Sequence, residues 1–137
     1  MRQTLYRNYL ESGILEADPL KLVCLLYRGA IQRIAEAREH LRQGDIAARG
    51  KAVAKAVAIV NHLVSSLDHE KGGEISPALL ALYDYIARRI HEGNFTQTDA
   101  PLAEAEQLLR TLFEAWEACQ PAAAESDEKY IPVSCAG

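Results

Sequence analysis

The segment that most limits the fold of this chain is ADPLKLVCLLYRGA, residues 17–30. Asp18 followed by Pro19 is typical of a helix start, because the Asp oxygen accepts from free backbone N–H groups and Pro lacks the donor that would be unpaired there. The apolar residues that follow cover almost every direction around the helix axis. One face can enter a core, but the other must be covered by another part of the chain, a second subunit or a ligand. This surplus favours a binding protein.

The first half of the chain predicts two helices. The first runs from Pro19 to about Gln43, where Gly44 supplies a left-handed stop, and the second starts at its cap Asp45 and ends near His69. Spacings of three and four give the first helix a core seam of Val23, Tyr27, Ala30, Ile34, Ala37 and Leu41, with Leu22, Leu25 and Leu26 off it. The second helix carries two neighbouring apolar stripes, which are Ile46, Val53, Val57, Val60, Val64 and Leu67, and Ala52, Ala56, Ile59 and Leu63.

The second half predicts two more helices. The dipeptide Ser76-Pro77 repeats the cap-and-proline signal and opens the third, residues 93–98 read as a loop, and Asp99 or Ala100 leads into Pro101 and the fourth. Apolar side chains share one side of the third helix at Leu79, Leu82, Tyr83, Ile86 and Ile90, and of the fourth at Leu102, Ala105, Leu109, Leu112, Trp116 and Cys119. Tyr83 and Tyr85 point in different directions on a helix, so we expect one of them to face outward.

These patterns predict an all-α fold, an antiparallel up-and-down four-helix bundle with an N-terminal capping segment and a disordered C-terminal tail. We expect one domain over residues 1–119, in which 1–17 form a lead-in, because 137 residues suit a single domain. The lead-in carries Tyr6, Tyr9 and Ile14 and is too short to fold alone, so we expect it to dock on the surplus apolar surface. In residues 120–137, Pro, Ala, Ser and acidic residues replace the periodic pattern, which predicts disorder.

Charge and cysteine usage narrow the compartment and the partners. The net charge is −4, and no basic patch is interleaved with aromatic residues, so nucleic acid is not an expected partner. Cys24, Cys119 and Cys135 lack the spacing of a disulfide framework or a zinc knuckle. No stretch is apolar for long enough to span a bilayer, so no membrane insertion is expected, and the N-terminus lacks the apolar core of a signal peptide. We expect a cytoplasmic protein.

Signals for catalysis or cofactors are weak. Residues 44–51 resemble a phosphate-binding loop only superficially, because the spacing is wrong and no strand precedes them. The bundle metal motif Glu-x-x-His is absent, since no carboxylate stands three residues before any of the four histidines. Six glutamates are predicted to lie on the solvated faces of the first and fourth helices: Glu36, Glu39, Glu104, Glu106, Glu114 and Glu117. Two of them are spaced to form surface ion pairs, Glu39 with Arg42 and Glu106 with Arg110. We predict no catalytic residue, no metal site and no cofactor.

His62 raises one alternative of a different class, a histidine phosphotransfer bundle. Some helical bundles display a phosphoryl-accepting histidine with Lys and Gly just beyond it, because a cation offsets the phosphate charge and Gly leaves room for it. Here those two positions are Ser65 and Ser66. The sequence therefore favours this hypothesis far less than a binding function.

The order of the motifs along residues 6–119 resembles that of the FliS family of flagellar secretion chaperones. The resemblance rests on Tyr6-x-x-Tyr9 with Ile14, Ala17-Asp18-Pro19-x-x-Leu22, Leu26-Tyr27-Arg28-Gly29-Ala30, Leu63 to Leu67 before Gly72-Gly73-Glu74-Ile75, Leu79-x-x-Leu82-Tyr83-Asp84-Tyr85-Ile86-x-Arg88-Arg89, and Ala115-Trp116. Each piece is weak alone, but the ordered set is specific. The resemblance implies an antiparallel helical bundle without enzymatic activity.

The resemblance also implies a function and a binding site. A FliS-like chaperone binds the disordered C-terminal segment of flagellin in the bacterial cytosol, prevents premature polymerisation and delivers flagellin to the flagellar type III export apparatus. By this resemblance, the partner-binding positions are Tyr6, Tyr9, Ile14, Leu22, Leu26, Tyr27, Leu82, Tyr83, Tyr85 and Ile86, as groove or groove-support residues. One further alternative function stays open, a co-chaperone or regulator of another flagellar component. The partners that stay open besides flagellin are the flagellar export gate, other flagellar regulators and a second copy of the chain in a homodimer.

Overall fold

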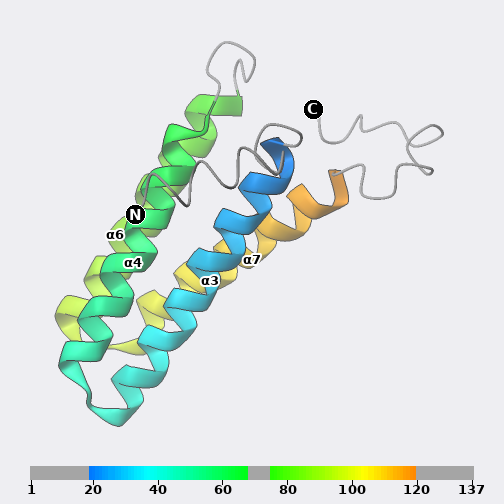
Figure 1. Cartoon of the computed structure of the whole chain (residues 1–137). Helices are drawn as coiled ribbons and strands as arrows, with labels where there is room; N and C mark the ends of the chain where they lie inside the picture. The colour runs from blue at the N-terminus through cyan, green and yellow to red at the C-terminus, as the bar shows by residue number, and fades with distance from the viewer. Residues whose placement is uncertain (1–18, 68–74, 120–137) are drawn as a thin grey trace.

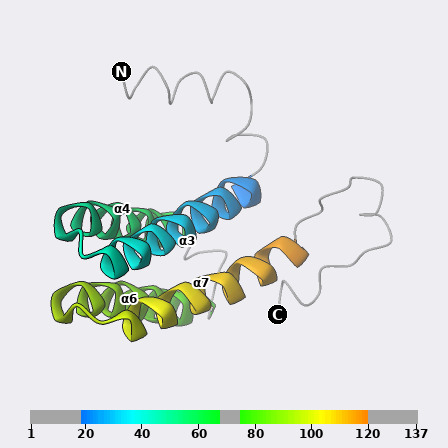
Figure 2. The same ribbon diagram turned by 90° about the horizontal axis from the view of Figure 1, so that it is seen from below.

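The computed structural model describes residues 19–67 and 75–119 as a bundle of α3 (Pro19–Gln43), α4 (Ile46–Ser65), α6 (Ile75–Thr96) and α7 (Asp99–Cys119) (Figure 1). Viewed along another direction, the helices form two layers, α3 beside α4 and α6 beside α7 (Figure 2). Each helix packs against the next one in the chain, and α7 packs back against α3. The predicted antiparallel up-and-down bundle is confirmed. The lead-in, the tail and their domain boundaries lie outside the described residues and stay predictions.

The two ends of the bundle differ in their connections. At the closed end, Gly44-Asp45 joins α3 to α4 and Gln97-Thr98 joins α6 to α7. At the open end, α3 begins and α7 ends (Figure 1). The predicted left-handed stop at Gly44 is confirmed by its φ of 76°, and the predicted cap is confirmed because the Asp45 carboxylate accepts from the Ala48 N–H at 3.1 Å.

The predicted loop at residues 93–98 is wrong, because α6 continues to Thr96. Gly93 serves close packing: a Cβ atom there would lie 2.7 Å from Leu102 Cγ of α7. Asn94 serves a helix contact, since its side-chain oxygen accepts from Arg49 Nε of α4 at 2.7 Å. The chain instead turns at Gln97, whose φ is 57°.

Other predicted helix limits shift by one turn or less. α6 begins at Ile75, so Ser76 lies in its first turn, buried, rather than capping it. α7 begins at Asp99, two residues before Pro101, and α4 ends at Ser65, while His69 lies outside the described residues.

Among the residues whose burial the structure describes, the core follows the predicted seams except at Ile46. Side chains without measurable exposure come from all four helices: Tyr27, Ala30, Ile34, Ala37, Ala56, Leu63, Ile86, Ile90, Leu102, Ala105 and Leu109. Tyr83 faces inward and Tyr85 outward, as expected. Ile46 does not join the stripe of the second helix, because it is 61% exposed at the first residue of α4, at the closed end.

Candidate partner-binding surface

The surplus apolar residues of α3 lie at the open end, as the sequence predicts. Leu22 and Leu26 are half-buried and Leu25 is 46% exposed, whereas Tyr27 in the same turns is fully buried. The seam of α3 therefore enters the core, and the three leucines remain partly accessible beside it. Tyr6, Tyr9 and Ile14, which we expected to cover this surface, lie outside the described residues.

The site positions implied by the family resemblance divide into two groups. Tyr27, Tyr83 and Ile86 are buried, with at most 1% of their surface exposed, so they can shape a binding surface only from below. The accessible members are Leu22, Leu26, Leu82 and Tyr85, on α3 and α6. The second group can contact a partner directly.

The two buried tyrosines connect opposite helices of the bundle. The Tyr27 and Tyr83 hydroxyl oxygens are 2.6 Å apart and share a hydrogen bond, and the two ring centroids are 6.4 Å apart. The ring centroid of Phe113 of α7 lies 6.5 Å from that of Tyr27. Burial is the main cause that raises the pKa of both phenols, so both hydroxyls stay protonated, and one of them donates the hydrogen bond that the other accepts. This cluster links α3, α6 and α7 beneath the accessible residues.

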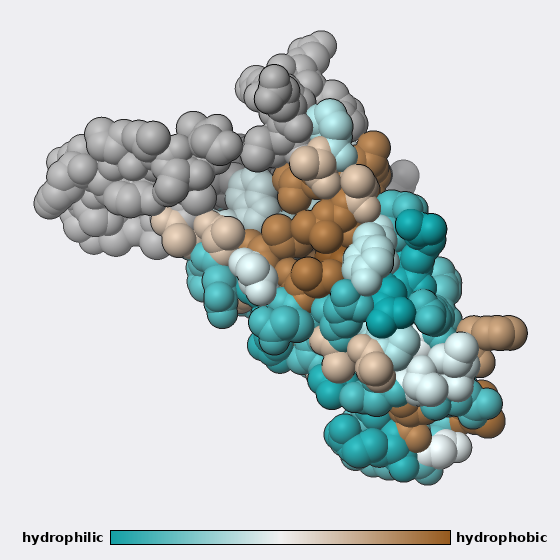
Figure 3. Space-filling view, turned by 180° about the vertical axis from the view of Figure 1, so that it is seen from behind, coloured by the Kyte–Doolittle hydropathy of each residue, from teal (hydrophilic) through white to brown (hydrophobic). Residues whose placement is uncertain are grey.

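An apolar patch covers the layer formed by α6 and α7, toward the open end (Figure 3). We define the α6–α7 apolar face by four half-buried leucines that pack on the core: Leu79, Leu82, Leu108 and Leu112. The spacings of three and four place each pair on one side of its helix. Leu112 was predicted on the apolar side of the fourth helix, but its alignment with Leu82 depends on how α6 and α7 pack.

A polar cluster lies where this face meets the closed half of the bundle. Glu104 of α7 accepts from the Tyr85 hydroxyl at 2.7 Å and from Arg89 Nε at 2.6 Å. These two hydrogen bonds, that of Tyr85 first, lower the pKa of Glu104, and the same contact raises the pKa of Tyr85. Tyr85 is therefore held in one orientation, with its ring available at the border of the apolar face.

A second polar cluster was missed by the sequence reasoning. Arg38 of α3 forms two bonds to Asp99, at 2.7 and 2.9 Å, and one to Glu106 at 2.8 Å. Glu106 is only 8% exposed, so its interpretation as part of a solvated face is wrong, although its predicted pairing with Arg110 is confirmed. Burial pushes the pKa of Glu106 up, but hydrogen bonds from Arg38 and Arg110 outweigh it and hold that pKa below its usual value. The hydrogen bond from Arg38 likewise lowers the pKa of Asp99.

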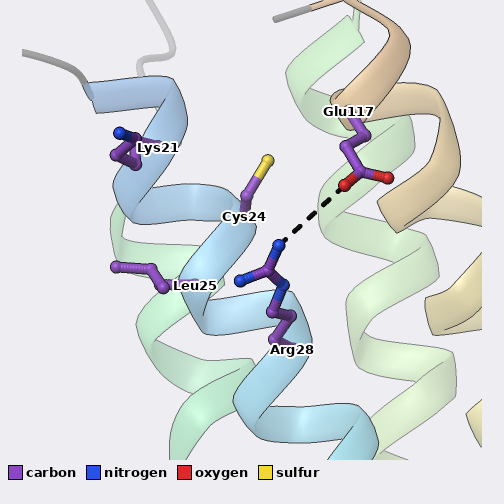
Figure 4. Close-up of a pocket in the computed structure, with 5 residues that line it drawn as sticks. All are labelled: Lys21, Cys24, Leu25, Arg28 and Glu117. Carbon is purple, nitrogen blue, oxygen red and sulfur yellow. Dashed lines mark ion pairs between the residues drawn. The ribbon is translucent and has the colours of Figure 1, made fainter. Parts of the chain in front are cut away.

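A pocket of about 280 Å³ lies beside the first turns of α3 and the last turn of α7, lined by Lys21, Cys24, Leu25, Arg28 and Glu117 (Figure 4). Arg28 and Glu117 face each other across it with 4.0 Å between their nearest atoms. The Arg28 guanidinium also lies 5.6 Å from the centroid of the Phe113 ring. We call this site the α3–α7 pocket.

The described residues contain no group of His, Cys, Asp and Glu side chains arranged to hold a metal ion. Within the same ranges, none of the helices has the length and apolarity required to cross a membrane. His62 is exposed near the end of α4, so burial does not argue against phosphotransfer, but the positions beyond it remain Ser65 and Ser66. The protein is therefore a helical bundle with an accessible apolar surface. This combination is typical of the class of proteins that bind other chains.

Comparison with known proteins shows which family has this arrangement. The family model described as flagellar protein FliS matches residues 1–123. The flagellar secretion chaperone FliS of Salmonella typhimurium is 39% identical over 121 residues, covering 88% of this chain and 90% of that protein. FliSB of Pseudomonas aeruginosa is 32% identical, covering 79% and 86%, and FliS of Bacillus subtilis is 28% identical, covering 83% and 84%. The chain belongs to the FliS family, which is a family of flagellar export chaperones and not of enzymes.

Proposed function

We propose that this protein is a cytoplasmic export chaperone for flagellin. It binds the disordered C-terminal segment of flagellin, prevents premature polymerisation and delivers flagellin to the flagellar type III export apparatus. The observation that carries the proposal is the α6–α7 apolar face, which a chain of the FliS family leaves accessible beside a well-filled core. An apolar face of this kind has to be covered by something.

The geometry suits an amphipathic segment that folds as it binds. A helix laid along α6 and α7 can present apolar side chains at spacings of three and four to Leu79, Leu82, Leu108 and Leu112. Ordering a disordered partner costs several kcal/mol, which a wide contact surface has to offset. The leucines of α3 extend the accessible apolar surface to a second side of the open end, so a partner that wraps around this end could contact both.

The residues implied by the resemblance take distinct roles in this proposal. Flagellin contacts the accessible residues of the set, which are Leu22, Leu26, Leu82 and Tyr85. The ring of Tyr85 lies at the border of this surface, where Glu104 accepts a hydrogen bond from its hydroxyl. Three buried residues keep the surface in shape: Tyr27, Tyr83 and Ile86. The lead-in residues Tyr6, Tyr9 and Ile14 are the remaining partner-binding positions in this proposal, and they lie outside the described residues.

Calorimetry with one matched pair of variants tests the proposal. The full chain is titrated with the C-terminal region of flagellin from the same bacterium, and a roughly one-to-one complex is expected. Leu82→Glu should weaken binding by at least about tenfold, because it puts a charge into the apolar contact. Leu80→Glu on the same helix, 39% exposed and outside the α6–α7 apolar face, should bind as the wild type does.

The alternatives give different results in the same design. Absence of wild-type binding to flagellin would overturn the proposal, and capture of another flagellar protein from the same cytosol would identify a co-chaperone or regulator instead. Equal losses for Leu82→Glu and Leu80→Glu would place the contact elsewhere on the bundle. Sedimentation of the free protein reports whether a homodimer forms before flagellin is added.

A further inference from the structure

The α3–α7 pocket has an apolar interior and a cationic rim. Cys24 is 6% exposed and Leu25 adds an apolar wall, while the charged side chains among the described residues that line the pocket are Lys21, Arg28 and Glu117. The side chains of Arg28 and Glu117 are 63% and 52% exposed, so this part of the rim faces solvent. An apolar cavity of about 150 Å³ already takes up a molecule the size of benzene, so this pocket has room for a large side chain. It therefore suits a short segment that combines acidic and apolar residues.

The chain itself contains such a segment shortly after α7. Glu125, Asp127 and Glu128 are followed by Lys129 and then by Tyr130-Ile131-Pro132-Val133, so the segment carries three acidic side chains and one lysine. Glu117, a wall of the pocket, lies two residues before the end of α7. About ten residues then lead to Tyr130, and a chain of that length spans at most ~35 Å when fully extended. Tethering so close to the pocket gives a high effective concentration, and thus favours this segment over an equivalent free peptide.

We propose that residues 125–133 bind in the α3–α7 pocket of the same chain. The acidic side chains lie at Lys21 and Arg28, and an apolar side chain from Tyr130 to Val133 enters beside Cys24 and Leu25. Charge complementarity selects this segment over the lead-in, because residues 1–17 combine two acidic side chains with two arginines.

When residues 125–133 bind in the α3–α7 pocket, they cover part of the open end of the bundle. Leu25 is 46% exposed among the described residues, and the bound segment removes it from water. Because Leu22 and Leu26 lie in the same turns of α3, the segment also limits access to that side of the surface. This inference goes beyond the proposed function and is tested without flagellin.

Zero-length carbodiimide crosslinking of the full chain, read by mass spectrometry, tests the contact. Lys21 is expected to link to Glu125, Asp127 or Glu128, and the yield should fall at high salt because the attraction is between exposed charges. The double variant Ile131→Ser, Val133→Ser should lower this yield about fivefold or more, because the apolar anchor is lost. The double variant Ala122→Ser, Ala124→Ser also introduces two serines, but into the linker between α7 and residue 125, and should leave the yield unchanged.

Hydrogen exchange of the same three proteins supplies the second measurement. Amides of residues 21–28 should exchange faster in the Ile131→Ser, Val133→Ser variant than in the wild type or the linker variant, because the cover over α3 is lost. Links from Lys21 to Glu11 or Glu16 in place of the acidic run would show that the lead-in occupies the pocket and would overturn the proposal. So would equal yields and equal exchange in all three proteins.

Discussion

At the closed end, two-residue connections tie α3 to α4 and α6 to α7, whereas at the open end α3 and α7 meet through side chains. The closed-end turns are built alike: the N–H of Asp45 bonds to the carbonyl of His40 at 3.0 Å, and that of Thr98 to the carbonyl of Gly93 at 3.1 Å. The open end instead contains the tyrosine pair, the α6–α7 apolar face and the α3–α7 pocket. Single apolar side chains are exposed near the closed end, at Ile46 and Phe95, whereas the leucines of the α6–α7 apolar face and the α3–α7 pocket lie toward the open end.

This difference separates stability from binding within one small bundle. Arg49 and Asn94 join α4 to α6 near the closed end, and Arg38 joins α3 to α7 through Asp99, the first residue of α7. These contacts fix the relative positions of the helices without using the apolar residues of the open end. An apolar surface that must stay accessible to a partner can then be kept without loss of the fold, because local stability need not be uniform.

The largest expected effect comes from breaking the aromatic cluster beneath the open end. Tyr27→Ala should lower the free energy of unfolding by about 4 kcal/mol, because it leaves a large cavity and removes the partner of the Tyr83 hydroxyl. Tyr85→Ala is the matched control: Tyr85 is 37% exposed, and its loss should lower the free energy of unfolding much less. Urea denaturation measures both, and equal losses would show that the two tyrosines do not divide into support and contact.

The next effect concerns the ion cluster between α3 and α7. Arg38→Ala should cost about 2 kcal/mol, because Glu106 loses one of its two cations while 8% exposed. Arg42→Ala removes the exposed pair with Glu39 and should lower the free energy of unfolding much less, because solvent screens that pair. Urea denaturation at neutral pH measures both losses of unfolding free energy. Comparable losses would contradict the conclusion that Arg38 stabilises the bundle more than an exposed arginine does.

The same cluster predicts how stability depends on pH. The pKa values of Asp99 and Glu106 are lower in the folded protein than usual, so their stabilising contribution is complete above the usual carboxyl pKa near 4. It is lost as the pH falls from there through the folded-state pKa values. Unfolding measured from pH 7 to pH 3 should therefore show a smaller acid loss in Arg38→Ala than in the wild type. Parallel curves for the two proteins would mean that other carboxylates dominate.

Two glycines in helices test how closely the closed end is packed. Gly93→Ala should destabilise by about 1–3 kcal/mol, because the added Cβ would lie 2.7 Å from Leu102 Cγ and 3.1 Å from the Thr98 carbonyl oxygen. Gly50→Ala meets nothing within 4 Å in α4 and should instead stabilise by about 0.5–1 kcal/mol through helix propensity. Thermal unfolding of both variants checks the opposite signs, and stabilisation by Gly93→Ala would disprove the close approach of α6 to α7.

The sequence predicts local periodicity far better than it predicts contacts between helices. The seam through Tyr27 and Ile34, the stop at Gly44 and the inward Tyr83 follow from local spacing and turn chemistry. The extension of α6 through Gly93 and Asn94 does not, because these residues are turn formers by propensity and are used here for packing against α7 and α4. The burial of Glu106 likewise depends on Arg38, which lies 68 residues away in the chain. The candidate site followed from the ordered family motifs, and its division into contact and support residues required the packed bundle.

The smallest effect compares the two closed-end turns directly. Gly44 and Gln97 occupy the same left-handed position, with φ of 76° and 57°, but only the first is the residue type that adopts it without strain. Gln97→Gly should therefore stabilise by about 0.5 kcal/mol, since relief of the strain slightly exceeds the added entropy of the unfolded chain. Gly44→Gln should destabilise by about 1 kcal/mol for the reciprocal reason. Thermal unfolding measures both changes, and if Gln97→Gly lowers stability, the Gln97 side chain must make a contribution that outweighs its backbone strain.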